Sequence, residues 1–89
     1  MQILSSAGGA NAASRAEVER ALGAPDIERR DGAGAALTYR LPTCALLLLF
    51  SADQRDTMRL REVHADARHA GAPAPSQSAC AAEAEARRR

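Results

Sequence analysis

Residues 35–51 read AALTYRLPTCALLLLFS and contain the two patterns on which the fold prediction depends. In the first half, Leu37, Tyr39 and Leu41 alternate with Thr and Arg, which is typical of an antiparallel strand with one buried face. The second half, 44–51, is apolar at nearly every position, which indicates a central strand or a strand covered on its second face as well. A Pro-Thr pair supplies a tight connection between the two strands.

A short helix is predicted upstream, over residues 15–22. Ser14 and Glu17 have the spacing of a capping box, in which each side chain accepts a hydrogen bond from the backbone N–H of the other residue. Gly23 then ends the helix, and Pro25 prevents its continuation.

Two further strands complete the predicted sheet. Residues 26–31 form a short polar strand, and residues 31–34 (DGAG) form a hairpin turn. Residues 58–68 alternate in polarity with a break in phase, which predicts a β-bulge near Arg61 and Glu62. After a Gly/Pro-rich loop, Ala and Glu at 78–86 favour a second helix.

The core of such a domain is thin and needs a covalent constraint. Of the 89 residues, 22 are alanine, which buries little area. Cys44 and Cys80 would pair in an oxidising compartment, closing a loop worth roughly 4 kcal/mol, whereas in the cytosol they would remain two buried thiols.

The predicted fold class is therefore α+β. A short N-terminal helix packs on a three- to four-stranded antiparallel sheet, and a disulfide ties back the C-terminal segment. Residues 1–13 are expected to be a flexible lead-in, 14–82 the domain, and 83–89 a charged C-terminal tail.

Catalytic, cofactor and metal sites are not predicted, and the protein is not expected to be an enzyme. The serines lack a nucleophile-elbow motif, and His64 and His69 lack the spacing of a zinc site. A net charge of +1 and two aromatic residues give no reason to expect a nucleic-acid partner. The longest apolar run, 45–50, has the length of a strand and is too short for a membrane helix.

Arginines on the predicted strands could form a face that docks an acidic protein or the lipid headgroups of a membrane surface. The alternative is solvated charge that pairs with neighbouring carboxylates. The candidate residues for this face are Arg29, Arg40, Arg59 and Arg61.

Five stretches together resemble the SmpA/OmlA (BamE-like) group of small bacterial envelope proteins, whose fold is shared by the repeats of the β-lactamase inhibitor protein. They are residues 18–26 (VERALGAPD), 29–32 (RRDG), 38–40 (TYR), Cys44 with the apolar strand after it, and 63–68 (VHADAR).

This resemblance implies a periplasmic or envelope location and a structural or protein-binding role with an envelope protein as partner. Because the first residues, MQIL, lack the basic start of a signal peptide, we expect the export signal to lie upstream. An enzyme inhibitor and a cytosolic protein are the alternatives. The sequence leaves the oligomeric state open.

Overall fold

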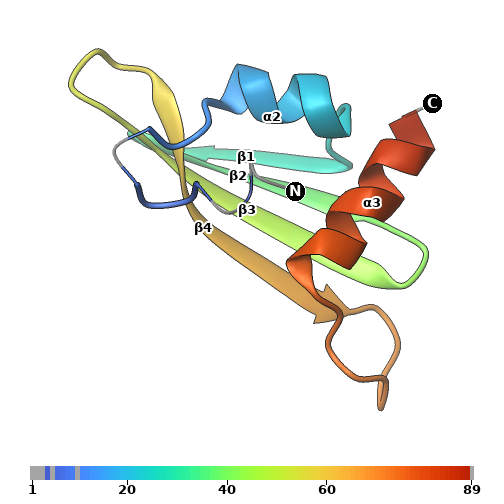
Figure 1. Ribbon diagram of the computed structural model, residues 1–89. Coiled ribbons are helices and arrows are strands. Elements are labelled where there is room, and N and C mark those ends of the chain that lie inside the picture. The colour runs from blue at the N-terminus through green and yellow to red at the C-terminus, as the bar shows by residue number, and fades with distance from the viewer. Residues whose placement is uncertain (1–3, 5, 10, 89) are drawn as a thin grey trace.

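The computed structural model describes residues 4, 6–9 and 11–88 and contains one four-stranded antiparallel sheet with a helix on either side of it in the sequence. The strands are joined in sequence order, β1-β2-β3-β4, so that the sheet is a simple meander (Figure 1). The predicted fold class is confirmed. The elements are α2 (Arg15–Leu22), β1 (Ile27–Asp31), β2 (Gly34–Arg40), β3 (Cys44–Ala52), β4 (Met58–Ala67) and α3 (Gln77–Arg88).

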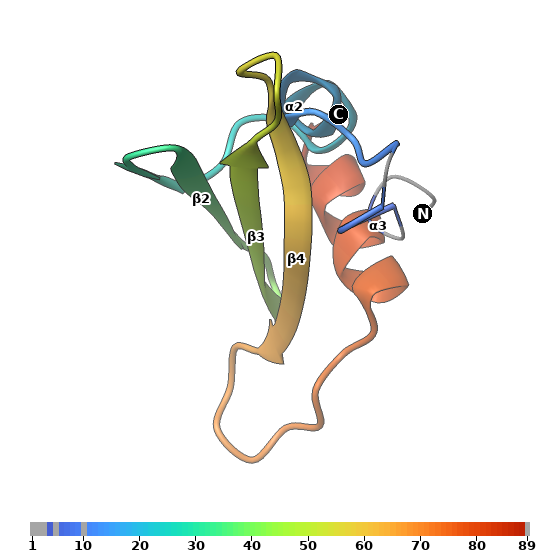
Figure 2. The ribbon, with the colours of Figure 1, turned by 90° about the vertical axis from the view of Figure 1, so that its left-hand side faces the viewer.

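Both helices cover the same side of the sheet, which we call the helix face (Figure 2). The core lies between the sheet and the two helices, and alternate residues of the strands point into it. The opposite side, which carries Leu47 and Leu49 of β3 and the side chains in register with them, is called the open face. None of the described elements packs on the open face (Figure 2).

The core combines large side chains from the sheet with residues of both helices, of which those of α3 are small. The sheet and its β2–β3 turn contribute Leu37, Tyr39, Leu41, Cys44, Leu46, Leu48, Phe50 and Leu60, all at most 3% exposed. The helices contribute Val18, Leu22, Cys80, Ala81 and Ala84. Because α3 buries two alanines and one cysteine, hydrophobic burial alone holds this helix weakly.

The helix α2 has the predicted bounds and the predicted cap. Ser14 Oγ accepts from the Glu17 N–H at 3.2 Å, and Glu17 Oε1 accepts from the Ser14 N–H at 2.9 Å. Gly23 ends the helix at a φ of 86° and donates its N–H to the carbonyl of Glu19 at 2.8 Å. Such a positive φ strains residues with a Cβ, which explains the glycine.

Each strand begins and ends within one residue of its predicted bounds. The bulge lies where the broken alternation predicted it. Leu49 pairs with Glu62 and Phe50 pairs with Leu60, so Arg61 has no partner on β3. The extra residue restores the phase of β4, and Leu60 therefore reaches the core.

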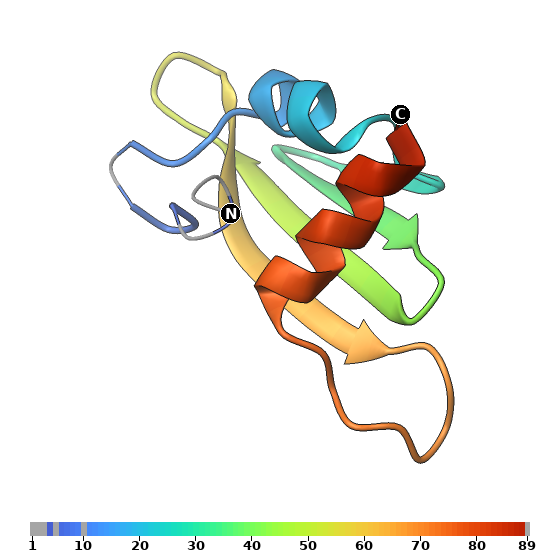
Figure 3. The same cartoon turned by 45° about the vertical axis from the view of Figure 1, so that its right-hand side comes forward.

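The predicted disulfide is present and connects the first residue of β3 to α3. The Cys44 and Cys80 sulfurs are 2.10 Å apart and the Cα atoms 5.7 Å apart, which is ordinary disulfide geometry. Both cysteines are fully buried. Figure 3 shows α3 lying across the sheet above β3 and β4, where the bond holds it.

The chain ends pack on the domain where they are described. Leu4, Ala12 and Ala13, from the segment predicted to be a flexible lead-in, are buried. The helix α3 runs through most of the predicted charged tail, and the backbone N–H of Thr43 donates to Glu83 Oε1 at 3.0 Å. Residues 1–3, 5, 10 and 89 of these two segments lie outside the described residues.

Two neighbouring leucines on β3 give a matched test of the core. We expect Leu48→Asp to abolish folding, because Leu48 is fully buried and an unpaired carboxylate there costs several kcal/mol. Leu47→Asp should leave the fold intact, since Leu47 is half-buried on the open face. Circular dichroism and thermal melts would check both variants, and equal effects would contradict the assignment of the two faces.

The disulfide should supply most of the net stability. Replacing both cysteines with alanine should lower the free energy of unfolding by about 4 kcal/mol, because the bond closes a loop with a sequence separation of 36 residues. Hydrogen exchange should then show faster exchange in α3 than in β2 and β3. Unchanged protection of α3 in the variant would show that packing, without the bond, holds this helix.

Candidate functional site

The open face has an aliphatic centre that lacks a covering layer among the described residues. Leu47 and Leu49 alternate along β3 with the buried Leu46 and Leu48, so they point to the opposite side of the sheet. Ile27 of β1 lies in the same row as Leu47 and is 38% exposed, the large apolar residue that the described surface exposes most. An aliphatic centre of this kind is available for contact with another molecule.

Strand pairing arranges the open-face side chains in rows that cross the sheet from β1 to β4. One complete row consists of Ile27, Thr38, Leu47 and His64, and the next consists of Arg29, Ala36, Leu49 and Glu62. A third complete row, at one end of the face, consists of Asp31, Gly34, Ser51 and Arg59. At the other end, Arg40, Ala45 and Asp66 form a shorter row.

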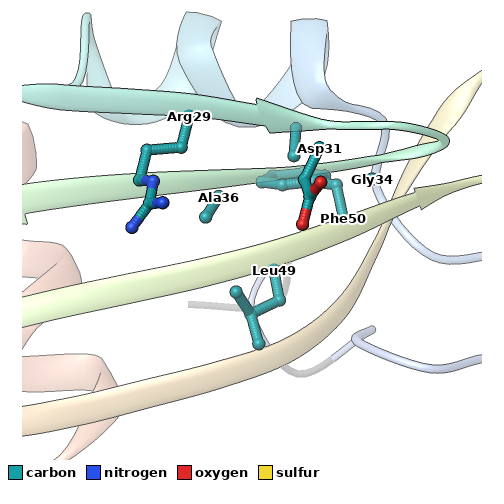
Figure 4. Close-up of a pocket in the computed structure, with 7 residues that line it drawn as sticks. Arg29, Asp31, Gly34, Ala36, Leu49 and Phe50 are labelled. Carbon is teal, nitrogen blue, oxygen red and sulfur yellow. The ribbon is translucent and has the colours of Figure 1, made fainter.

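A hollow of about 380 Å³ opens on this face above the start of β2 (Figure 4). Gly34 and Ala36 form its floor, because they have almost no side chain to fill it. Arg29 and Asp31 extend from β1 on either side of Ala36, and Leu49 stands on the β3 side (Figure 4). At Gly34 the space is limited on the β3 side, since an added Cβ would lie 3.2 Å from the carbonyl oxygen of Phe50.

The strand register places all four predicted arginines in or beside the rows of the open face. Arg29 and Arg40 follow the alternation of β1 and β2, and the bulged Arg61 donates from Nε to Ser51 Oγ at 2.7 Å. Across the described residues, the Arg29 guanidinium has no hydrogen bond or ion pair. It is therefore free to bind an anionic group.

Arg59, the fourth predicted arginine, is engaged in structural contacts. Its Nε donates to Asp53 Oδ2 at 3.1 Å and its Nη1 to the carbonyl of Ala12 at 3.2 Å. Glu17 Oε1 lies 3.8 Å from the same Nη1. The structure thus separates Arg59 from the other three by its contacts, and its part in partner binding stays a prediction.

A polar junction fixes the start of β1 and so the edge of the open face. The Asp26 carboxylate accepts from the backbone N–H of Arg40 at 2.7 Å and from Arg87 Nη1 at 2.6 Å. These bonds, first that to Arg87 and then that to Arg40, lower the pKa of Asp26. Arg87 also donates to the carbonyls of Ala24 and Arg40, and α3 therefore contacts the loop before β1.

Tyr39 supports the same junction from inside the core. Its hydroxyl donates to the carbonyl of Gly23 at 2.7 Å, and the Arg87 guanidinium carbon lies 5.7 Å from the centre of its ring. Burial raises the pKa of Tyr39 to about 12. The phenol is therefore protonated at neutral pH and serves as a hydrogen-bond donor that ties the end of α2 to β2.

Among residues 4, 6–9 and 11–88, no three His, Cys, Asp or Glu side chains are grouped as metal ligands. His64 Nε2 lies 3.2 Å from Glu62 Oε1 on the exposed side of β4. Within the described residues, no helix is both long enough and apolar enough to cross a bilayer.

The hollow and the aliphatic centre were not part of the predicted site. The signal for the centre was the run Leu46-Leu47-Leu48-Leu49, half of which had to face away from the core. The signal for the hollow was a glycine and an alanine two residues apart on one strand. Locating them beside Leu49 and Arg29 required the strand register, which composition and periodicity do not give.

Comparison of the chain with protein-family models, with curated proteins and with solved structures found no match. The resemblance to the SmpA/OmlA group therefore remains a prediction from the residues quoted above.

The Asp26 junction makes the stability of the domain depend on pH. Because the folded-state pKa of Asp26 is lowered, its contribution is complete above the unfolded value near 4 and is lost as the pH falls through the folded value. We expect Asp26→Asn to destabilise the protein by roughly 1 kcal/mol at pH 7 and by much less at pH 2.

Urea unfolding at a series of pH values would measure this difference. Asp56→Asn is the matched control, because the Asp56 carboxylate lies in an exposed turn and has no partner among the described residues. A difference between wild type and Asp26→Asn that stayed constant with pH would contradict the role assigned to the carboxylate.

Proposed function

We propose that the domain is a non-catalytic protein-binding module of the bacterial cell envelope and that it docks its partner on the open face. The observation that carries this proposal is the half-exposed pair Leu47 and Leu49 in the middle of a sheet face bordered by charged side chains. An apolar centre with a polar rim is the usual anatomy of a protein–protein interface.

The disulfide supports the envelope location. Disulfides persist in oxidising compartments, such as the bacterial periplasm, and are rare in the cytosol. Here the bond connects two fully buried cysteines and secures an alanine-rich helix. A domain that depends on such a bond is suited to an oxidising compartment.

The charge balance of the open face favours a protein over a membrane surface. Arg29, Arg40 and Arg61 alternate there with acidic side chains, those of Asp31, Glu62 and Asp66. An anionic bilayer attracts clustered positive charge, and a mixed surface of this kind gains little from it. The inhibitor alternative called for an aromatic-rich face, but Tyr39 and Phe50 are both buried on the helix side.

The proposal can be tested by affinity capture from envelope extract of the source organism with immobilised wild-type domain and two variants. Leu47→Asp alters the open face, and Arg20→Ala alters the exposed side of α2 as the matched control. We expect a partner that wild type and Arg20→Ala retain equally and that Leu47→Asp loses.

Equal retention by all three proteins would contradict docking on the open face. Cell fractionation checks the compartment separately. Recovery of the native protein from the cytosol with two free thiols would contradict the envelope location.

A further inference from the structure

The side chain of Leu49 and the hollow above Ala36 lie next to each other on the open face. Leu49 of β3 and Ala36 of β2 are register partners, so about 4.8 Å of strand spacing separates the leucine from the floor of the hollow. The hollow is lined by Leu49 itself on one side and by Arg29 on the other. It is large enough to accept one aliphatic side chain from outside.

The charged residues of the open face have opposite signs at the two edges of the sheet, row by row. In the row of Ala36 and Leu49, β1 carries Arg29 and β4 carries Glu62. In the adjacent end row the signs reverse, because β1 carries Asp31 and β4 carries Arg59, with the bulged Arg61 beside it bound to Ser51.

The opposite end of the face follows the same rule. Arg40 of β2 lies in one row with Asp66 of β4. The row of Ile27, Thr38, Leu47 and His64 has no such pair, so three of the four rows combine a charge on the β1–β2 side with the opposite charge on the β4 side.

From these two features we propose that the open face binds the open face of a second copy of this chain. The two-fold axis would run parallel to the strands, in the plane between the two sheets and level with the gap between β2 and β3. Rotation about this axis leaves positions along the strands unchanged and exchanges the two edges of the sheet, so β1 faces the partner's β4 and β2 faces the partner's β3.

The rows of Arg29 and Asp31 are then complementary to themselves in the second copy, whereas Arg40 of β2 faces the partner's Ala45. Arg29 lies opposite the partner's Glu62, and Asp31 lies opposite the partner's Arg59, next to the bulged arginine. Leu49 enters the hollow above the partner's Ala36, and the partner's Leu49 does the same in return. A two-fold axis across the strands would instead place β1 over the partner's β1 and β4 over the partner's β4.

The result is a sandwich of two sheets at the usual spacing of about 10 Å, with the helices on its outer sides. Four strands of about seven residues cover roughly 450 Å² on each copy, or roughly 900 Å² for two. This area lies below that of standard stable interfaces, so the dimer should be weak and reversible, with a dissociation constant in the micromolar range or above. Such a dimer could open to admit another partner.

This inference rests on the proposed function, because it names the partner of the same face. Sedimentation velocity of the purified, oxidised domain over a concentration series measures the dissociation constant directly. We expect a monomer–dimer equilibrium for wild type. Ala36→Leu, which fills the hollow, should weaken the dimer at least tenfold.

Charge reversal tests the orientation. Arg29→Glu and Glu62→Arg should each weaken the dimer about tenfold or more, since each change creates two like-charge contacts across the two-fold axis. The double variant should return to within about threefold of wild type. Both residues are exposed, and circular dichroism would verify that each variant is folded.

A wild-type domain that stays monomeric at millimolar concentration would overturn self-association. A dimer that the double variant fails to restore would overturn the proposed symmetry axis. Neither result would affect the capture experiment with Leu47→Asp, which tests whether the open face binds any protein, so the two proposals can fail separately.

Discussion

The covalent bond between Cys44 and Cys80 determines how the rest of the domain is assembled. The sheet supplies nearly all the large apolar side chains, while α3 offers small ones, whose burial does little to offset the entropy of ordering a 12-residue helix. Once the bond places α3 across β3, Glu83 reaches Thr43 and Arg87 reaches Asp26. These contacts in turn secure the loop before β1 and the turn between β2 and β3, which both lie beside the end of β2 at Arg40.

Placing both helices on one side of the sheet gives β3 two different environments. Its core side is filled by large residues, whereas the aliphatic side chains on the other side are left half-exposed. A chain of 89 residues buries little surface, so uncovered leucines are a cost to solubility unless a partner covers them. The charged rows around them limit that cost and restrict which surfaces can dock.

Local sequence signals were enough to predict most of the fold. The capping box fixed α2, alternation identified β2, and the phase break near Arg61 located the bulge. The site was harder, because alternation assigns a side chain to a face but does not say which residues of distant strands are neighbours. The hollow beside Leu49 and the contacts of Arg59 depend on register and on loop paths, which tertiary packing decides.

The order of elements along the chain also sets the order in which the domain can mature. The four strands are neighbours in sequence and pair through short turns, so the sheet can form from local contacts as the chain emerges from a ribosome or a translocon. Cys80 follows all of them, and oxidation is therefore the last covalent step. With two cysteines in the sequence a single intramolecular pairing exists, so an oxidant alone is sufficient and no isomerase is needed to correct the bond.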